Sequence, residues 1–164
     1  MKDILLINVS GQDKPGVTSV VTEVLSSFEV TVLDIGQAVI HDQLNLGILA
    51  AVPRSEDSEA LINGVKSSLL ALEMQVIFSP ITEQRYQHWV EQQGKSRYIV
   101  TLLARKIDAQ HLAAVAKVTS EYGLNIDKIV RLSGRIKLNE SGQLGRACVE
   151  FSVRGEPKDA VQFK

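Results

Sequence analysis

The residues best suited to chemistry in this sequence form a short loop at positions 11–18, Gly-Gln-Asp-Lys-Pro-Gly-Val-Thr. The loop follows an apolar, β-branched run at 4–9 and precedes a helical pattern at 17–28. A tight Pro-Gly turn at a helix start leaves backbone N–H groups free at the positive end of the helix dipole. We therefore expect the loop to hold a small anionic group such as a carboxylate. A nucleotide is disfavoured, because the phosphate-loop motif needs Lys and then Ser or Thr after its second glycine, whereas Val17 follows Gly16.

Other reactive side chains lack the neighbours that catalysis or metal binding requires. The three histidines fall in different predicted elements, without partners at metal-ligand spacing: His41, His88 and His111. Cys148 lies in the middle of a predicted strand, where a small buried thiol is favoured over a nucleophile. The sequence contains no Gly-x-Ser-x-Gly, His-Glu-x-x-His, Gly-x-Gly-x-x-Gly or Asp-x-Asp motif. We expect a binding region with no catalytic residue, metal ligand or cofactor of its own.

Composition limits the class of partner. The chain has 164 residues, 45% of them hydrophobic, and a formal net charge of -1 with acidic and basic residues intermixed. This balance argues against nucleic acid and anionic membranes as partners. One cysteine, no signal-peptide core and no apolar run of the roughly 20 residues that a membrane span needs favour a cytoplasmic location.

The elements around the loop predict a βαββαβ module over residues 1–81. Apolar positions at intervals of three and four mark one helical face at 17–28, and the runs on either side alternate as strands do. The expected strands are 4–9, 30–41, 44–52 and 73–79, and the expected helices are 17–28 and 58–72. This order is the split arrangement of ferredoxin-like α+β modules, in which two helices cover one face of an antiparallel sheet.

A second module repeats the first. Residues 82–94 are polar and are interpreted as a linker, and the strand–helix–strand–strand order then begins again over 95–164. A shift of 94 residues superimposes Val21 on Val115, Val24 on Val118 and Phe28 on Tyr122. The second hairpin loop, at 138–143, is longer and raises the offset to 101. With that offset the module's last helix and strand would extend past residue 180. We therefore expect an incomplete second module, either because the chain is a fragment or because a partner covers the exposed face.

Several polar residues near the predicted turns are candidates for binding. Asp13, Gly16, Val17 and Thr18 lie at the first strand-to-helix turn, and Asp34 and Gln37 lie on the following strand. Asn125 and Asp127 begin the corresponding strand of the second module. The alternative is purely structural: Asp13 would cap a helix, Pro15-Gly16 would form the turn, and Asn125 and Asp127 would only start a strand. The residues alone do not choose between these interpretations.

The loop at 11–18, the strand at 32–40 and the hairpin at 44–49 together resemble an ACT domain. More narrowly, the chain is similar to the tandem ACT region at the N-terminus of one branch of bacterial phosphoserine phosphatases. In the second module, residues 123–127 and 149–155 agree with this resemblance. Gln110 falls where Gly16 would be, without a Pro-Gly turn, so a second equivalent pocket is doubtful.

The resemblance implies a regulatory function. Such modules bind amino acids where modules meet, with serine the leading candidate here, and the expected ligand residues are Asp13, Pro15, Gly16, Val17, Thr18, Asp34, Asn125 and Asp127. It also implies a homodimer, and a parent enzyme whose haloacid-dehalogenase-type domain uses an aspartate and magnesium to hydrolyse phosphoserine. The alternatives are a free-standing tandem-ACT regulator, similar to the glycine-cleavage-system repressor family, and a purely structural dimerisation module.

Overall fold

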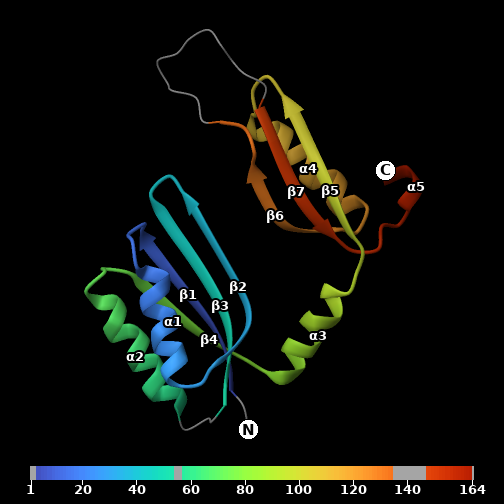
Figure 1. Cartoon of the computed structure of the whole chain (residues 1–164). Helices are drawn as coiled ribbons and strands as arrows, with labels where there is room; N and C mark the ends of the chain where they lie inside the picture. Colours follow the sequence, from blue (N-terminus) through green and yellow to red (C-terminus); the bar gives the residue numbers. More distant parts are fainter. Residues whose placement is uncertain (1–2, 54–56, 135–146, 164) are drawn as a thin grey trace, which may run out of the picture. The chain divides into compact units, whose positions relative to one another are not determined.

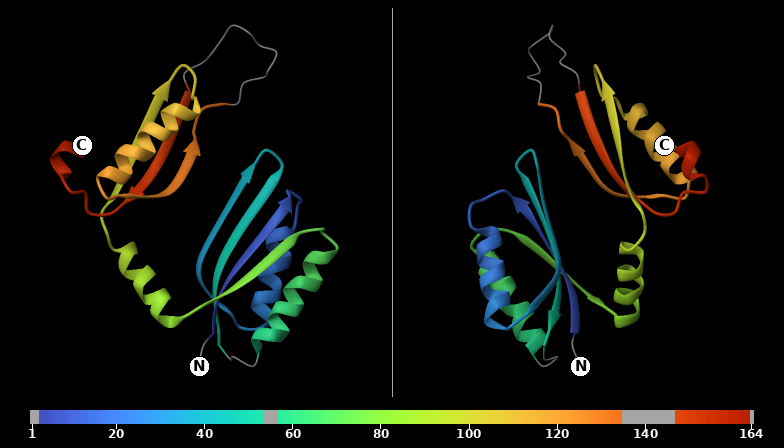
Figure 2. Two further views of the ribbon diagram at one scale, coloured as in Figure 1. Left: turned by 180° about the vertical axis from the view of Figure 1, so that it is seen from behind. Right: turned by 45° about the vertical axis from the view of Figure 1, so that its right-hand side comes forward.

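A computed structural model describes residues 3–53, 57–134 and 147–163 of the chain, and Figures 1 and 2 show its elements. The chain divides into two compact units, Met1–His88 and Trp89–Lys164. The division falls within helix α3 (Glu83–Gln93), which occupies most of the segment interpreted as a linker. Among the described helices, none is long and apolar enough to cross a membrane. The two units are described separately below.

The first unit has the predicted βαββαβ order. Its elements are β1 (Asp3–Gln12), α1 (Val17–Ser27), β2 (Thr31–Ile40), β3 (Gln43–Val52), α2 (Ser58–Leu70) and β4 (Gln75–Ile81). The four strands form one antiparallel sheet in the order β2-β3-β1-β4, so that β1 and β3 are central. Both helices lie against one face of this sheet, as Figure 2 shows.

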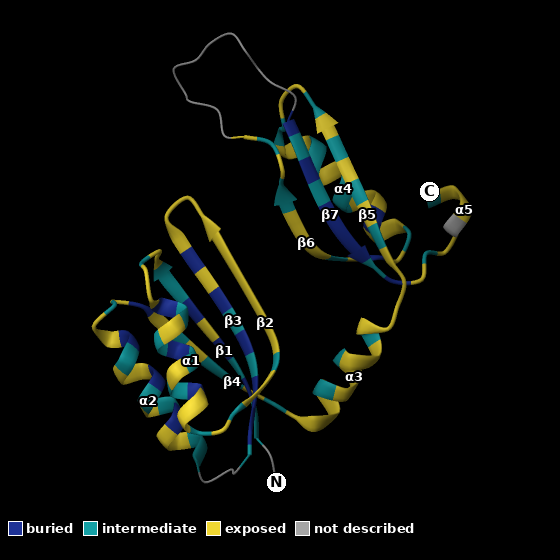
Figure 3. Ribbon diagram, in the orientation of Figure 1, coloured by how far each residue is buried: buried dark blue, intermediate teal, exposed yellow. Residues whose placement is uncertain are grey.

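The core of this unit follows from alternation along the central strands. Leu5, Ile7 and Val9 of β1 point toward the helices and are buried, as are alternate residues of β3 from Leu44 to Val52 (Figure 3). Helix α1 contributes Val17, Val21 and Leu25, and α2 contributes Leu61, Val65 and Leu69. The 3.6-residue periodicity of the helices thus meets the two-residue periodicity of the strands in one apolar layer.

The second unit repeats the first four of these six elements. It contains β5 (Arg97–Ala104), α4 (Ala109–Glu121), β6 (Asn125–Arg131), β7 (Ala147–Arg154) and the short α5 (Ala160–Phe163). The strands pair in the order β5-β7-β6. The long hairpin loop expected at 138–143 lies outside the described residues. Within the described part of this unit, no strand pairs with the outer edge of β5 as β4 pairs with β1.

The repeat extends to an irregularity in the backbone. The pairing of β2 with β3 shifts between Val32 and Asp34, and the pairing of β6 with β7 shifts between Ile126 and Lys128. These shifts are β-bulges, and their unpaired residues, Leu33 and Asp127, are separated by the 94 residues that align the two modules. The repeat predicted from apolar positions is therefore also present in the strand geometry.

The two modules differ where α2 packs. In the first, a Cβ on Gly64 of α2 would lie 3.2 Å from Val24 and 3.8 Å from Phe28, so the helices approach closely. The equivalents of Val24 and Phe28 in the second module, Val118 and Tyr122, line an open apolar cavity of about 350 Å³ instead. Phe163 of α5 also lines this cavity, and its ring centroid lies 5.4 Å from that of Tyr122 and 5.5 Å from that of Tyr98.

This difference predicts losses of stability of different size for one substitution at two equivalent positions. In Val24→Asp, a charge is placed between α1 and α2, and we expect a loss of at least about 2 kcal/mol of stability. Val118 is 46% exposed, so Val118→Asp should cost less than about 1 kcal/mol. Urea unfolding followed by circular dichroism measures both. Equal losses would contradict the difference in packing between the modules.

Candidate functional site

The turn between β1 and α1 presents an uncapped helix start. Gly16 occupies the N-cap with φ 93° and ψ -8°, and no side chain caps the helix. The first intrahelical hydrogen bond is donated by Val20 N to Gly16 O at 2.9 Å. Helix geometry therefore leaves the N–H groups of Val17, Thr18 and Ser19 without an intrahelical acceptor. A Cβ at Gly16 would meet nothing within 4 Å, so the space beside the turn is open.

Three neighbouring segments hold this turn in place. Thr18 Oγ1 of α1 donates to Gln37 Oε1 of β2 at 2.6 Å, and Asp13 N donates to Asp42 O in the β2–β3 hairpin at 2.7 Å. Lys14 Nζ donates to Leu72 O at 3.0 Å and to Glu73 Oε2 at 2.9 Å, beyond the end of α2. The loop is thus tied to the edge strand, the hairpin tip and the α2–β4 connection at once.

Packing beneath the loop requires a glycine at its first position. A Cβ on Gly11 would lie 2.8 Å from Met74 Sδ and 3.5 Å from Met74 Cα. Met74 belongs to the core and is 9% exposed. Gly11 combines this close approach with a φ of 156°, whereas Gly16 has a φ of 93° and open space beside it.

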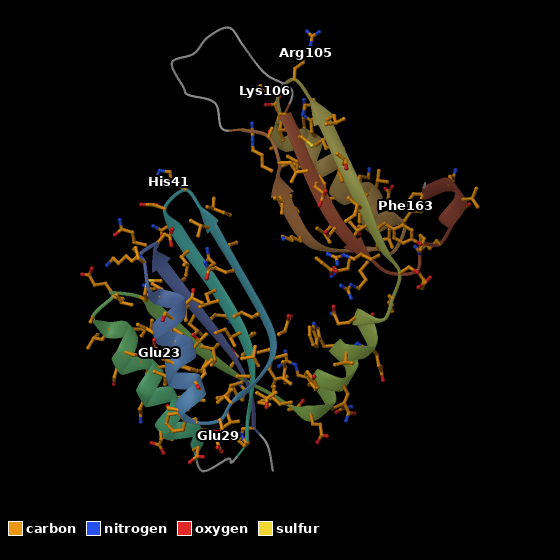
Figure 4. The ribbon with its side chains drawn as sticks, viewed as in Figure 1. Glu23, Glu29, His41, Arg105, Lys106 and Phe163 are labelled. Carbon is orange, nitrogen blue, oxygen red and sulfur yellow. The ribbon has the colours of Figure 1, made fainter. Side chains whose placement is uncertain are left out.

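Two carboxylates beside the loop are held in their charged forms. The Lys14 ammonium donates a hydrogen bond to Glu73 and lowers the pKa of that carboxyl. At the hairpin tip, hydrogen bonds from His41 and then Gln43 lower the pKa of Asp42. His41 Nδ1 lies 2.7 Å from Asp42 Oδ1, and Figure 4 shows His41 at the tip of the β2–β3 hairpin. Asp42 could not be singled out from local sequence patterns, because its contact with Asp13 depends on the hairpin register.

The structure brings Gln37, rather than Asp34, to the turn. Asp34 pairs with Leu49, between two β3 residues that are buried under the helices, so it lies on the other face of the sheet. Its carboxylate accepts a hydrogen bond from Ile35 N at 2.9 Å. Gln37 is three residues further along β2, and an odd separation in a strand reverses the face. The role of Asp34 in ligand binding remains a prediction.

In the second module, Asp127 has a partner within its own unit. Its carboxylate accepts from Arg154 Nε at 2.8 Å, and Arg154 Nη1 donates to Gln93 O at 2.6 Å, at the end of α3. A cation at this end of a helix is favoured by the helix dipole. Asn125 is exposed and pairs opposite Arg154. The structure thus groups Asn125 and Asp127 around Arg154, and their predicted contribution to a ligand site remains a prediction.

The helix start of the second module differs from that of the first. Asp108 is the N-cap of α4, and its N–H donates to His111 Nδ1 at 3.1 Å as part of a capping box. Lys106 Nζ lies 3.0 Å from the Asp108 carboxylate. The polar groups at this helix start therefore have partners from the chain itself, and no Pro-Gly turn opens it.

No metal site is formed by the residues that the structure describes, since none of their His, Cys, Asp and Glu side chains gather in threes or more. The first unit is thus a ferredoxin-like α+β module with an open helix start, a geometry suited to holding the carboxylate of a small molecule. Residues 3–79 match the family model of the ACT domain, and the first module belongs to that family.

Two curated relatives extend the match along the chain. The chain is 33% identical over 135 residues to phosphoserine phosphatase SerB2 of Mycobacterium tuberculosis, covering 79% of the chain and 31% of that protein. It is also 33% identical over 152 residues to a phosphoserine phosphatase of Streptomyces coelicolor, covering 92% of the chain and 33% of that protein. The chain therefore spans about a third of the length of these relatives.

Solved structures confirm the two-module fold. An unknown protein from Galdieria sulphuraria has a TM-score of 0.68 at 14% identity, covering 94% of this chain and 81% of that one. A putative glycine cleavage system transcriptional repressor has a TM-score of 0.61 at 13% identity, covering 99% of this chain and 86% of that one. At these identities the likeness concerns the fold alone.

The positive φ of Gly16 predicts a backbone cost for a side chain there. Gly16→Ala should lower stability by about 1–2 kcal/mol, because an L-residue is strained in the left-handed region. Gly36→Ala is the matched control, since a Cβ at Gly36 also meets nothing within 4 Å but no positive φ is involved; its change should stay within about 0.5 kcal/mol. Thermal unfolding of both variants tests this, and equal melting temperatures would refute the strain.

The Lys14–Glu73 pair predicts a pH-dependent anchor for the loop. Because the pKa of Glu73 is lowered in the folded state, its contribution is present above the ordinary carboxyl pKa of about 4.3 and is lost as the pH falls through the lowered value. Lys14→Met should raise the pKa of Glu73 toward its ordinary value. An NMR titration of the carboxyl carbon measures this, with Lys95→Met as the control. An unchanged Glu73 pKa in Lys14→Met would rule the anchor out.

Proposed function

We propose that this chain is an amino-acid-sensing regulatory region of a phosphoserine phosphatase and that its ligand is serine. The observation that carries the proposal is the uncapped start of α1 at Gly16, in a module of the ACT family. The relatives named phosphoserine phosphatase support the choice of parent enzyme. In that enzyme, a catalytic domain outside these residues would hydrolyse phosphoserine to serine with the help of magnesium, so serine would report on the end product.

The proposed binding mode uses the polarity of the helix start. The ligand carboxylate would accept hydrogen bonds from the N–H groups of Val17 and Thr18, where the helix dipole favours a negative group. Asp13 is exposed beside the turn and would face the ligand ammonium. Pro15 and Gly16 shape the turn, and the open space at Gly16 admits the ligand backbone.

The remaining predicted ligand residues would close the pocket from a neighbouring module. Asp34 lies on the sheet face opposite to α1, and Asn125 and Asp127 lie in the second unit. Asp34 would therefore reach a ligand at the Gly16 turn of another chain, as would Asn125 and Asp127, whose own module has no such turn. This arrangement fits a cytoplasmic homodimer in which modules of two chains complete the sites. For Asp127, ligand binding would compete with its ion pair to Arg154.

A free-standing two-module regulator is the second candidate. The likeness to a putative glycine cleavage system transcriptional repressor covers both modules of this chain, although it concerns the fold alone. The two candidates share the ligand site and differ in what the site controls. Translation of the reading frame beyond Lys164 separates them, because a phosphatase requires an Asp-x-Asp motif after a hydrophobic strand, whereas a stop soon after the second module would favour the regulator.

Serine binding is tested by calorimetry and thermal unfolding of the chain. We expect L-serine to bind and to stabilise the fold by about 2.7 kcal/mol at 100 times its dissociation constant. Thr18→Val, which removes the hydroxyl bonded to Gln37, should weaken binding at least fivefold. Thr101→Val, at an exposed position of β5, is the control and should bind as the wild type does. No heat and no stabilisation with millimolar serine would refute the sensor function.

A further inference from the structure

A second concave site lies on the face of the first unit's sheet that α1 and α2 leave uncovered. It is a cavity of about 400 Å³, within the size range of small-molecule pockets. Its floor follows the strand register, because Ala51 of β3 pairs with Ile4 on one side and Thr31 on the other. The floor is therefore one row across three strands, with two apolar side chains and one hydroxyl.

Helix α3 forms the wall of this cavity. It begins just after β4, where Thr82 Oγ1 accepts from Arg85 N at 3.3 Å, as a capping side chain does. Glu83, Tyr86 and Gln87 line the cavity. Their spacing of three and four residues places them on one helical face, so the first two turns of α3 present a polar edge to the apolar floor.

The β-bulge of β2 completes the site. Leu33 is the unpaired residue of the bulge and lines the cavity. Leu33 lies two residues after Thr31, so both side chains lie on the same face of the sheet, and the bulge interrupts the pairing with β3 beside them. At the equivalent position of the second module, Asp127 is bonded to Arg154 instead. A β-bulge at equivalent positions thus lies beside a cavity in the first module and beside an ion pair in the second.

The charge of the lining selects the ligand class. Glu83 carries the only formal charge among the described residues that line the cavity, and none of these residues is basic. Its carboxylate accepts from Gln87 Nε2 at 3.4 Å, a long hydrogen bond that leaves acceptor capacity unused. We propose that this cavity binds a primary ammonium with a short aliphatic group. The ammonium lies against Glu83, with the Thr31 hydroxyl as a further acceptor, and the aliphatic part lies on Ile4, Leu33 and Ala51.

This ligand class differs from that of the proposed function. An amino acid also carries a carboxylate. At the start of α3 the Glu83 side chain already supplies the negative charge that a helix dipole favours, whereas α1 has no acidic residue in its first turn and leaves its N–H groups to a ligand. The two sites therefore discriminate by charge: the turn at Gly16 takes the carboxylate of a zwitterion, and the cavity takes an amine without one. Failure of one site does not imply failure of the other.

Two probes with the same hydrocarbon and opposite charge test the proposal on the whole chain. Isobutylammonium chloride and sodium isobutyrate are titrated separately at constant ionic strength, and NMR records the methyl signals of Ile4, Leu33 and Ala51. We expect saturable shifts at these methyl groups with isobutylammonium and at least tenfold weaker binding of isobutyrate. Equal binding of the two ions, or isobutylammonium shifts elsewhere only, would overturn the proposal.

Variants identify the groups responsible. Glu83→Gln keeps the shape of the side chain and removes its charge, and it should weaken isobutylammonium binding at least tenfold. Glu59→Gln removes an exposed carboxylate from α2 and is the matched control, with unchanged binding expected. Ala51→Leu fills the floor and should abolish binding, while an unchanged circular dichroism spectrum reports that the fold persists. Wild-type affinity in Glu83→Gln, or an equal loss in Glu59→Gln, would overturn the assignment.

Discussion

The pairing of β1 with β3 is the constraint on which the rest of the first module depends. It runs without a break from Asp3 opposite Val52 to Gln12 opposite Gln43. At its centre Ile7 pairs with Ile48, and both side chains are fully buried. A shift of one residue would turn every apolar side chain of β1 to the other face, so the register is strongly specified. The same register places the end of β1, and hence the loop before α1, beside the hairpin tip.

Both candidate sites follow from this register. Where β1 ends, the chain must turn onto the sheet, and Gly16 allows the sharp entry into α1 at its positive φ. At the opposite end of β1, Ile4 lies beside Ala51, and this row forms the floor of the cavity under α3. The helix-covered face thus carries the turn with its free N–H groups, and the uncovered face carries the cavity with its carboxylate.

Local patterns were enough to predict most of the fold. Alternation of apolar residues predicts the strands, and apolar spacing of three and four predicts α1, α2 and α4. The recurrence of apolar positions after 94 residues, as from Val24 to Val118, predicts the second module. The sequence of helix α3 indicates only a linker because it is polar overall and contains no buried residue, so it lacks the apolar side chains that mark the other helices. Its first two turns line the same cavity as Ile4, which is far away in the sequence.

The candidate site could be predicted only in part, because local patterns do not show contacts between residues that are distant in the sequence. The turn at Gly16 is local in sequence and could be predicted from Pro-Gly and the following helix. The contacts of Asp127 and Asp42 could not, because they join residues through strand pairing: Asp127 meets Arg154 across β6 and β7, and Asp42 meets Asp13 across the end of the sheet. Strand alternation does predict that Asp34 and Gln37 face opposite sides of the sheet, because they are three residues apart.

The two modules differ at equivalent positions in whether their polar groups are open to a ligand or bonded within the chain. At the helix start, Gly16 leaves donors open in the first module, whereas Asp108 and His111 satisfy each other in the second. At the bulge, Leu33 lines a cavity, whereas Asp127 fixes Arg154 against the end of α3. Each change in the second module thus replaces accessible polar groups with a contact inside the chain. The first module therefore keeps the groups that a ligand can use, and the second uses the same positions to hold its own structure.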